Sequence, residues 1–147
     1  MSEFWGTYQS ALDSKGRINI PIKLRKNLIP EDDNTFMLIR GEGKCIIMYP
    51  LSGWKTHYNS IKDKLGSGRN FKVYTAHYMQ DSSLQTLDKQ GRINLTKKLI
   101  DYADLDGEVE IHTHGDHISV WKEHNIQEYL GSTEPEAEKI KKENDLE

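Results

Sequence analysis

An internal repeat constrains the fold of this chain more than any other feature of its sequence. The run LDSKGRINIPIKL at 12–24 returns as LDKQGRINLTKKL at 87–99, so a shift of 75 residues gives eight identities in thirteen positions. The similarity continues more weakly, with residues 36–54 running beside residues 109–126 after short deletions. A repeat of this kind sets the architecture as a whole, so we expect both halves of the chain to follow one plan.

Each repeat has the pattern of a β-hairpin, a short helix and a second β-hairpin. The first hairpin turns at a four-residue loop that contains Gly16 or Gly91, and alternating residues follow at 18–20 and 93–95. The second hairpins are expected at 35–40 with 45–49 and at 108–113 with 117–121. A ββαββ unit of about 40 residues is marginal alone. We therefore expect the two repeats to pair by interlocking their hairpins.

The segment between the repeats has the spacing of amphipathic helices. Apolar residues three and four apart favour a helix over residues 51–65, and the same spacing favours a second helix over 70–80, where a strand is the alternative. The last residues have almost no apolar content, so we expect a frayed helix or a partly disordered end. The expected division is residues 5–53 for the first module, 54–80 for a connecting helical segment, 82–125 for the second module, and 126–147 for the end of a C-terminal helix and an acidic tail.

The distribution of charge leaves nucleic acid open as a partner. The net charge is −3, which alone argues mildly against DNA binding. Residues 132–147 carry six acidic and three basic side chains, so they account for the whole of this charge. The neutral remainder contains two basic stretches, at 13–26 and 88–98, around the two repeated loops.

Composition argues against several other classes of protein. No window approaches the roughly 18–20 apolar residues that cross a bilayer, and the first residues lack the pattern of an export signal. The lone cysteine, Cys45, can form no internal disulfide, which agrees with a reducing compartment. We expect a cytoplasmic protein with no membrane partner.

The D-x-x-G-R motif at 13–17 and 88–92, with FWGTY at 4–8 and MYPLSGW at 48–54, resembles the MraZ family of bacterial transcriptional regulators. The resemblance covers about residues 4–130 and implies two tandem AbrB-type swapped-hairpin modules. The expected fold class is therefore α+β and mainly β, an AbrB-like barrel of two ββαββ repeats with peripheral helices. One departure is Leu95-Thr96 where the family usually has Ile-Pro, although Thr96 can still cap a helix.

The resemblance also implies a function and a set of site residues. Members form ring-shaped homo-oligomers, act at the nucleoid, and bind direct repeats of double-stranded DNA in the promoter of their own operon, within the division and cell-wall gene cluster. The Asp and Arg of each motif belong to the DNA-reading hairpin. This transfers to Asp13, Arg17, Asp88 and Arg92. The basic residues of the two stretches add Lys15, Lys23, Lys89 and Lys98 to the expected DNA contacts, and loop chemistry makes Asp13, Gly16, Asp88 and Gly91 the residues that orient the loops.

Local chemistry supports these assignments and keeps a second interpretation open. An arginine just after a tight turn can reach guanine O6 and N7 or a phosphate. Alternatively, Arg17 and Arg92 pair with Asp13 and Asp88 and merely hold their loops. Both interpretations are compatible, because a guanidinium group has five N–H donors.

Two other functions are alternatives to DNA binding. Residues His112, His114, Asp116 and His117 spell H-x-H-x-D-H, a metal-binding pattern of hydrolases, but only His124 follows to complete a two-metal site. An AbrB-type antitoxin is the second alternative, and it usually has one hairpin module and a longer toxin-binding tail. We therefore expect a DNA-binding protein that is not an enzyme and has no metal, cofactor or small-molecule substrate.

Overall fold

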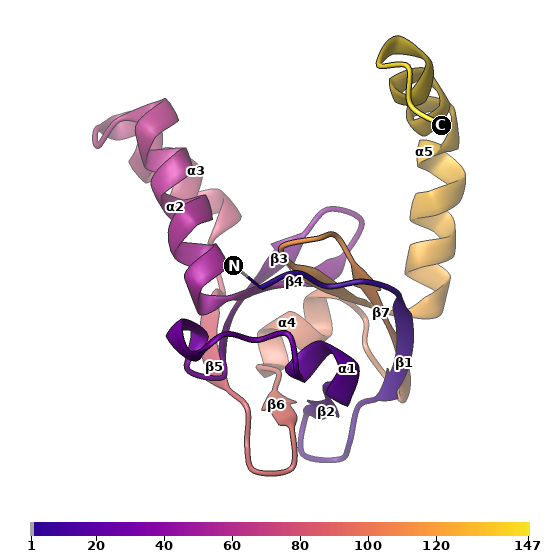
Figure 1. The fold of residues 1–147 in the computed structure, drawn as a ribbon. Helices are drawn as coiled ribbons and strands as arrows, with labels where there is room; N and C mark the ends of the chain where they lie inside the picture. Colours follow the sequence, from indigo (N-terminus) through magenta and orange to yellow (C-terminus); the bar gives the residue numbers. More distant parts are fainter. Residues whose placement is uncertain (1) are drawn as a thin grey trace.

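The computed structural model describes residues 2–147 and confirms that each repeat is ββαββ (Figure 1). The first repeat comprises β1 (Thr7–Ala11), β2 (Arg17–Asn19), α1 (Ile22–Arg25), β3 (Thr35–Gly41) and β4 (Cys45–Pro50), with a short 3₁₀ helix at Pro30–Asp32. The second comprises β5 (Ser83–Thr86), β6 (Arg92–Asn94), α4 (Lys97–Tyr102), β7 (Glu108–Thr113) and β8 (Ile118–Trp121).

The two repeats exchange strands. Six strands form one antiparallel sheet in the order β1-β7-β8-β4-β3-β5, and β2 pairs with β6 in a separate two-stranded sheet. Thr7 of the first repeat lies opposite His112 of the second, and Thr86 of the second lies opposite Thr35 of the first. The prediction that the hairpins interlock is therefore confirmed. The sheet order ends at β1 and β5, so within residues 2–147 hydrogen bonds do not close the strands into a complete barrel.

One hydrophobic core serves both repeats. Ile18 of β2 lies directly opposite Ile93 of β6, and both side chains are fully buried. Leu24 of α1 and Leu99 of α4 pack into the same cluster. Because each repeat contributes half of this core, neither repeat can bury its apolar face without the other.

The short helix after each first hairpin is preceded by a residue that suits a helix start. Pro21 precedes α1, where its missing N–H is not needed. Thr96 caps α4, since its hydroxyl accepts a hydrogen bond from the Leu99 amide at 3.4 Å. The departure from the usual Ile-Pro sequence thus leaves the second short helix in place.

Three longer helices project from the sheet. The helices predicted at 51–65 and 70–80 are observed as α2 (Leu51–Leu65) and α3 (Arg69–Tyr78), which form a hairpin between the repeats. The third, α5 (Glu123–Glu143), continues as a helix through most of the segment expected to be frayed or disordered, and partial disorder of the tail stays a prediction. No helix within residues 2–147 is both long and apolar enough to cross a membrane.

Candidate nucleic-acid interface

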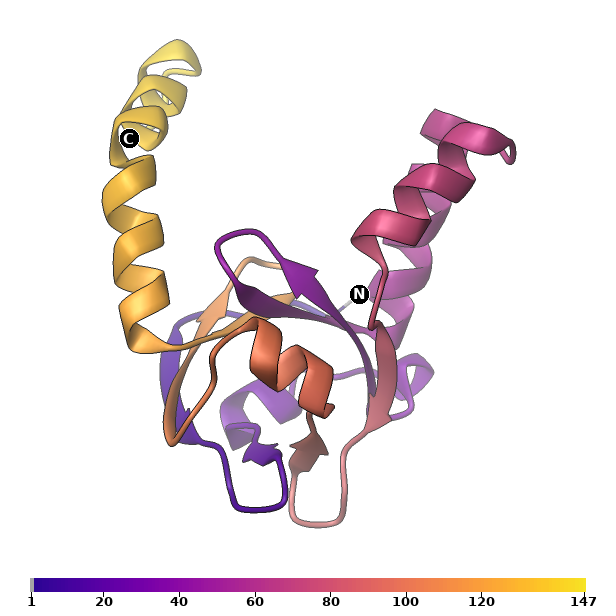
Figure 2. The ribbon, with the colours of Figure 1, turned by 180° about the vertical axis from the view of Figure 1, so that it is seen from behind.

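The two D-x-x-G-R loops lie side by side at the end of the molecule opposite the projecting helices (Figures 1 and 2). In the first loop the Gly16 amide donates to the Asp13 carbonyl at 3.1 Å, and in the second the Gly91 amide donates to the Asp88 carbonyl at 3.0 Å. The glycines have φ angles of +78° and +79°, which glycine adopts without steric cost. We call residues 13–17 and 88–92 the paired loops.

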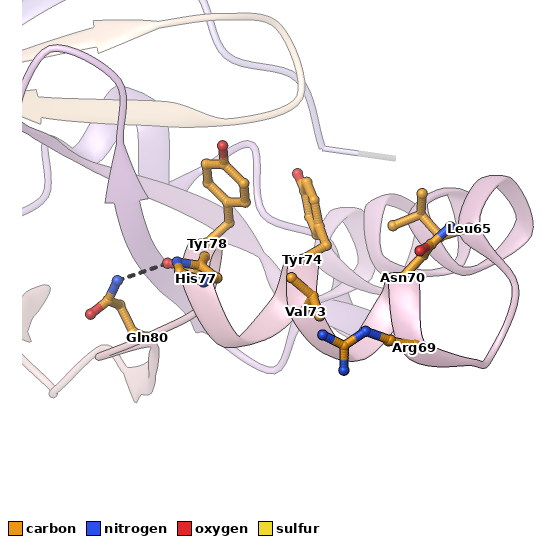
Figure 3. A pocket seen from close by; sticks show the side chains of 8 residues that line it. All are labelled: Leu65, Arg69, Asn70, Val73, Tyr74, His77, Tyr78 and Gln80. Carbon is orange, nitrogen blue, oxygen red and sulfur yellow. Dashed lines mark hydrogen bonds between the residues drawn. The ribbon is translucent and has the colours of Figure 1, made fainter.

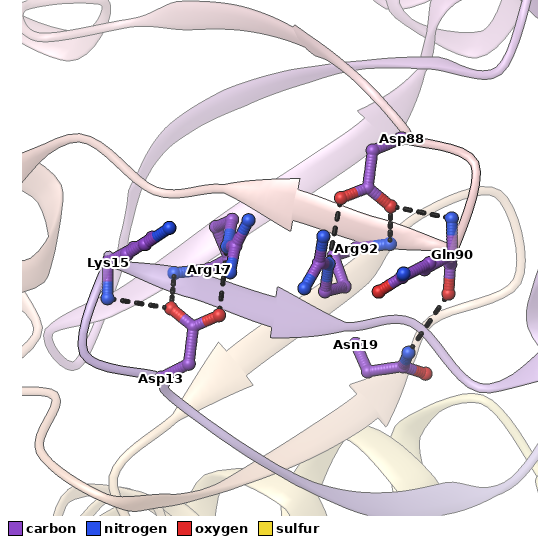
Figure 4. A network of polar contacts seen from close by, with 7 residues as sticks. All are labelled: Asp13, Lys15, Arg17, Asn19, Asp88, Gln90 and Arg92. Carbon is purple, nitrogen blue, oxygen red and sulfur yellow. Dashed lines mark hydrogen bonds and ion pairs between the residues drawn. The ribbon is translucent and has the colours of Figure 1, made fainter.

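Each loop is held by its aspartate (Figure 4). Asp13 Oδ1 accepts hydrogen bonds from the backbone amides of Lys15 and Arg17, both at 2.9 Å, and its Oδ2 accepts one from Arg17 Nε at 2.9 Å. Asp88 accepts the same three bonds from the Gln90 amide, the Arg92 amide and Arg92 Nε, at 2.9, 2.9 and 2.8 Å. The two loops therefore have the same internal hydrogen bonds in both repeats.

These hydrogen bonds keep both carboxylates ionised. The Arg17 amide holds the pKa of Asp13 below its ordinary value, with Arg17 Nε and the Lys15 amide contributing. In the second loop the Arg92 amide is the largest cause that lowers the pKa of Asp88, to about 2. An ionised carboxylate accepts all three bonds, because it has two oxygens and no proton to donate. At neutral pH each loop is therefore a closed hydrogen-bonded unit.

The paired loops are also fixed to each other. Asn19 of β2 lies opposite Arg92 of β6, and the Asn19 side chain donates to the Gln90 carbonyl at 3.2 Å. The carbonyl of each loop glycine accepts a hydrogen bond from the other repeat: the Ile20 amide donates to Gly91 at 2.9 Å and the Leu95 amide donates to Gly16 at 2.8 Å. The spacing between the two loops is thus set by two backbone hydrogen bonds and one bond from the Asn19 side chain, all to backbone carbonyls of the loops.

Both arginines retain donors that the protein does not use. Among the guanidinium nitrogens of Arg17 and Arg92, only Nε forms a hydrogen bond within residues 2–147. The terminal nitrogens of both groups are therefore free to bind a ligand. The two side chains are about a quarter exposed, at 23% and 29%. Lys15 and Lys89 are exposed beside them and form no ion pair with another described residue. The paired loops therefore gather four of the six cationic residues predicted to contact DNA.

The other two predicted cations lie on the short helices. Lys23 is exposed on α1. Lys98 is on α4, where its Nζ is 3.7 Å from Asp81. Asp81 lies just before β5, whereas the second loop lies just after β5. Because Lys98 is next to Asp81, it lies at the end of β5 that is away from the second loop. The structure does not bring Lys98 together with the arginines, and its contact with DNA stays a prediction.

Arg25 of α1 supports the second loop in a way that the sequence does not reveal. Its Nε donates to the Ile20 carbonyl at 2.7 Å, and its guanidinium group lies across Gly91. A Cβ atom at Gly91 would lie 2.5 Å from Arg25 Nε, so only glycine leaves room for this contact. The equivalent residue of the second repeat is Ile100, and the repeat therefore gives no signal for it.

The histidine-rich run at 112–117 lies at the end of β7 and in the turn before β8. Its histidines have separate partners: His112 is 3.2 Å from Glu110, His114 is 2.7 Å from Ser119, and His117 is 2.7 Å from Asp116. Within residues 2–147 no three His, Cys, Asp or Glu side chains are grouped as a metal ion would require.

Comparison with known proteins gives a family match over most of this chain. The family described as "MraZ protein, putative antitoxin-like" matches residues 4–67 and 79–146, which include both loops. The chain belongs to the MraZ family. Its resemblance to MraZ proteins, noted from the repeated motif, thus extends over nearly the whole sequence and includes α5.

Relatives of the MraZ family cover this chain almost completely. A "Transcriptional regulator MraZ" of Natranaerobius thermophilus is 34% identical over 140 residues, which are 95% of each chain. Proteins of the same name from Pediococcus pentosaceus and Halothermothrix orenii are each 31% identical over 137 residues, which are 93% of each chain. These MraZ relatives are named as regulators and not as enzymes.

Proposed function

We propose that this chain is a transcriptional regulator that binds double-stranded DNA through the paired loops. The observation that carries the proposal is that two hairpin tips with the same internal hydrogen bonds lie side by side, each with an arginine whose terminal nitrogens are unused. Free guanidinium nitrogens suit bidentate contacts with guanine or phosphate. The names of the MraZ relatives support a role in transcription.

The shape of the paired loops suits the major groove. B-DNA admits a two-stranded β-ribbon there, and β2 with β6 is a two-stranded antiparallel sheet that carries a loop at each strand start. Because the aspartates hold Arg17 and Arg92 in place, little conformational freedom is lost when the arginines bind. Lys15 and Lys89 then contact phosphates and add affinity that depends on salt rather than on sequence.

The same proposal includes the assembly and the target expected of the family. Several copies form a ring, act at the nucleoid in the cytoplasm, and bind direct repeats in the promoter of their own operon within the division and cell-wall gene cluster. One copy offers a small contact area. A ring that binds several repeats at once gains affinity because each later contact is intramolecular.

The test measures binding to DNA from upstream of the protein's own gene and to a scrambled duplex. Arg17→Ala and Arg92→Ala should each weaken specific binding, because a bidentate base contact contributes about 1–3 kcal/mol of discrimination. Lys15→Ala should reduce the salt dependence with little change in sequence preference. Lys139→Ala on α5 removes a positive charge far from the loops and serves as the control.

Two results would contradict the proposal. Specific binding by Arg17→Ala and Arg92→Ala at wild-type affinity would show that the loops are not the DNA-binding surface. Loss of folding or of assembly in both variants, measured by circular dichroism and light scattering, would mean that the arginines serve only to hold Asp13 and Asp88.

A further inference from the structure

The projecting helices form two arms of opposite charge. The basic arm, α2 and α3 over residues 51–78, carries five Lys and Arg and one Asp, a net charge of +4 without histidines. The acidic arm, α5 and the residues after it over 123–147, carries eight Asp and Glu and three Lys, a net charge of −5. Complementary charges of this size favour association of the two surfaces and suppress association of like surfaces.

The two arms of one copy do not meet. Both project from the side of the sheet opposite the paired loops, and both views show them apart at opposite ends of the molecule (Figures 1 and 2). The basic arm precedes β5 at one sheet edge, whereas α5 follows β8 and begins near β1 at the other. A contact between a basic and an acidic arm therefore requires two copies of the chain.

The basic arm carries a groove of about 790 Å³, whose apolar side chains lie among the polar Asn70, His77 and Gln80 (Figure 3). Val73 and Tyr78 of α3 line it with 41% and 62% of their surface exposed. Tyr74 and Leu65 add apolar surface, and Arg69 places a positive charge at one end. An apolar groove with a basic border suits an amphipathic helix that has acidic residues beside its apolar side chains.

The acidic arm carries a matching apolar stripe. Leu130, Ala137 and Ile140 lie on one side of α5 with Thr133, whose hydroxyl is bonded to the Tyr129 carbonyl, at intervals of three, four and three residues. This is the spacing of a helix seam that packs against a partner. Leu130 and Ile140 are about half exposed, at 50% and 49%. In the heptad pattern Glu134 and Glu136 flank this stripe, so they would face the border of a groove that receives it.

We propose that the acidic arm of one copy packs its apolar stripe into the groove of the basic arm of the next copy. This inference rests on the ring assembly included in the proposed function and names its interface. The two surfaces differ and lie at opposite ends of each copy, so the contact is head-to-tail and can be repeated around a ring. Because both arms point away from the paired loops, the contact leaves the loops of every copy free to bind DNA.

The experiment reverses the charge on one arm at a time. E134K/E136K places two lysines beside the stripe, and R69E places an acidic residue at the groove. Each variant alone should assemble more weakly than wild type, with the apparent dissociation constant of assembly, measured by sedimentation, raised about tenfold or more. An equimolar mixture of the two proteins should regain the wild-type mass, because both of its arm contacts are again complementary. E128K/E138K makes the same charge change on positions of α5 away from the stripe and should assemble like wild type.

The outcomes separate this inference from the proposed function. A wild-type ring that E134K/E136K and R69E leave unchanged would overturn the arm contact while the DNA-binding proposal stands. Equal loss of assembly in E128K/E138K, or no recovery in the mixture, would also overturn it, because net charge and not a specific contact would then control assembly. Arg17→Ala tests the DNA-binding surface independently, since it lies in the paired loops and should leave the mass of the assembly unchanged.

Discussion

Replacing Gly91 by alanine should destabilise the protein more than the matching replacement of Gly16, although the two loops have the same backbone. Both glycines have φ near +79°, so alanine at either position costs about 1–2 kcal/mol of backbone strain. At Gly16 the new Cβ would lie 3.3 Å from the Leu95 carbonyl oxygen, which a small shift relieves. We expect the Gly16→Ala free energy of unfolding to fall by about that strain alone.

Gly91→Ala has a second cost because Arg25 occupies the space that the Cβ needs. The Cβ would lie 2.5 Å from Arg25 Nε and 2.7 Å from Nη1, so the guanidinium group must move. That movement breaks the 2.7 Å hydrogen bond from Nε to the Ile20 carbonyl, and a bond from a charged donor contributes about 1.5–3 kcal/mol. The total loss should therefore be about 2.5–5 kcal/mol.

Thermal unfolding followed by circular dichroism at one protein concentration measures both variants. A chain of this size loses roughly 2–4 °C of Tm per kcal/mol, so Gly91→Ala should melt several degrees below Gly16→Ala. In an Arg25→Ala background the extra cost should vanish, which a double-mutant cycle reports directly. Equal losses at the two glycines, or an extra cost that persists without Arg25, would refute the argument.

Three further predictions follow from the same structure. The pKa of Asp88 is lowered from 3.8 to about 2 and that of Asp13 is also lowered, so the stability that these carboxylates contribute is present above pH 4 and lost as the pH falls toward 2. In Asp88→Asn the free energy of unfolding should therefore depend less on pH in this range, and an unchanged pH dependence in acid unfolding would contradict the prediction. Burial raises the pKa of the Cys45 thiol to about 12, so a thiol reagent at pH 8 should label the protein only in denaturant, and rapid labelling of the native state would show that Cys45 is exposed. Ser119→Ala leaves the buried Trp121 Nε1 without its 2.7 Å acceptor and should lower the free energy of unfolding by about 1–3 kcal/mol in urea titration, whereas an unchanged midpoint would mean that another acceptor replaces it.

The sequence determined the parts of the protein that depend on neighbouring residues. The repeated motif predicted both loops correctly, because an aspartate, a glycine and an arginine within five residues suffice to close the turn. The spacing of apolar residues predicted α2 to the residue and α3 within two residues, since that spacing places one apolar face on each helix. The predicted capping role of Thr96 likewise depends only on an amide three residues away.

Only the tertiary structure decided how these parts combine. The marginal size of one repeat predicted that the hairpins interlock, but no local pattern indicates which strands become partners, such as β1 and β7 across about a hundred residues. That choice depends on burying one core shared by both repeats. The contact of Arg25 with Gly91 joins different repeats and has no counterpart at Ile100, so neither periodicity nor the repeat could predict it. The separation of Lys98 from the arginines has the same origin, because residues nearby in sequence lie at opposite ends of β5 once the chain is folded.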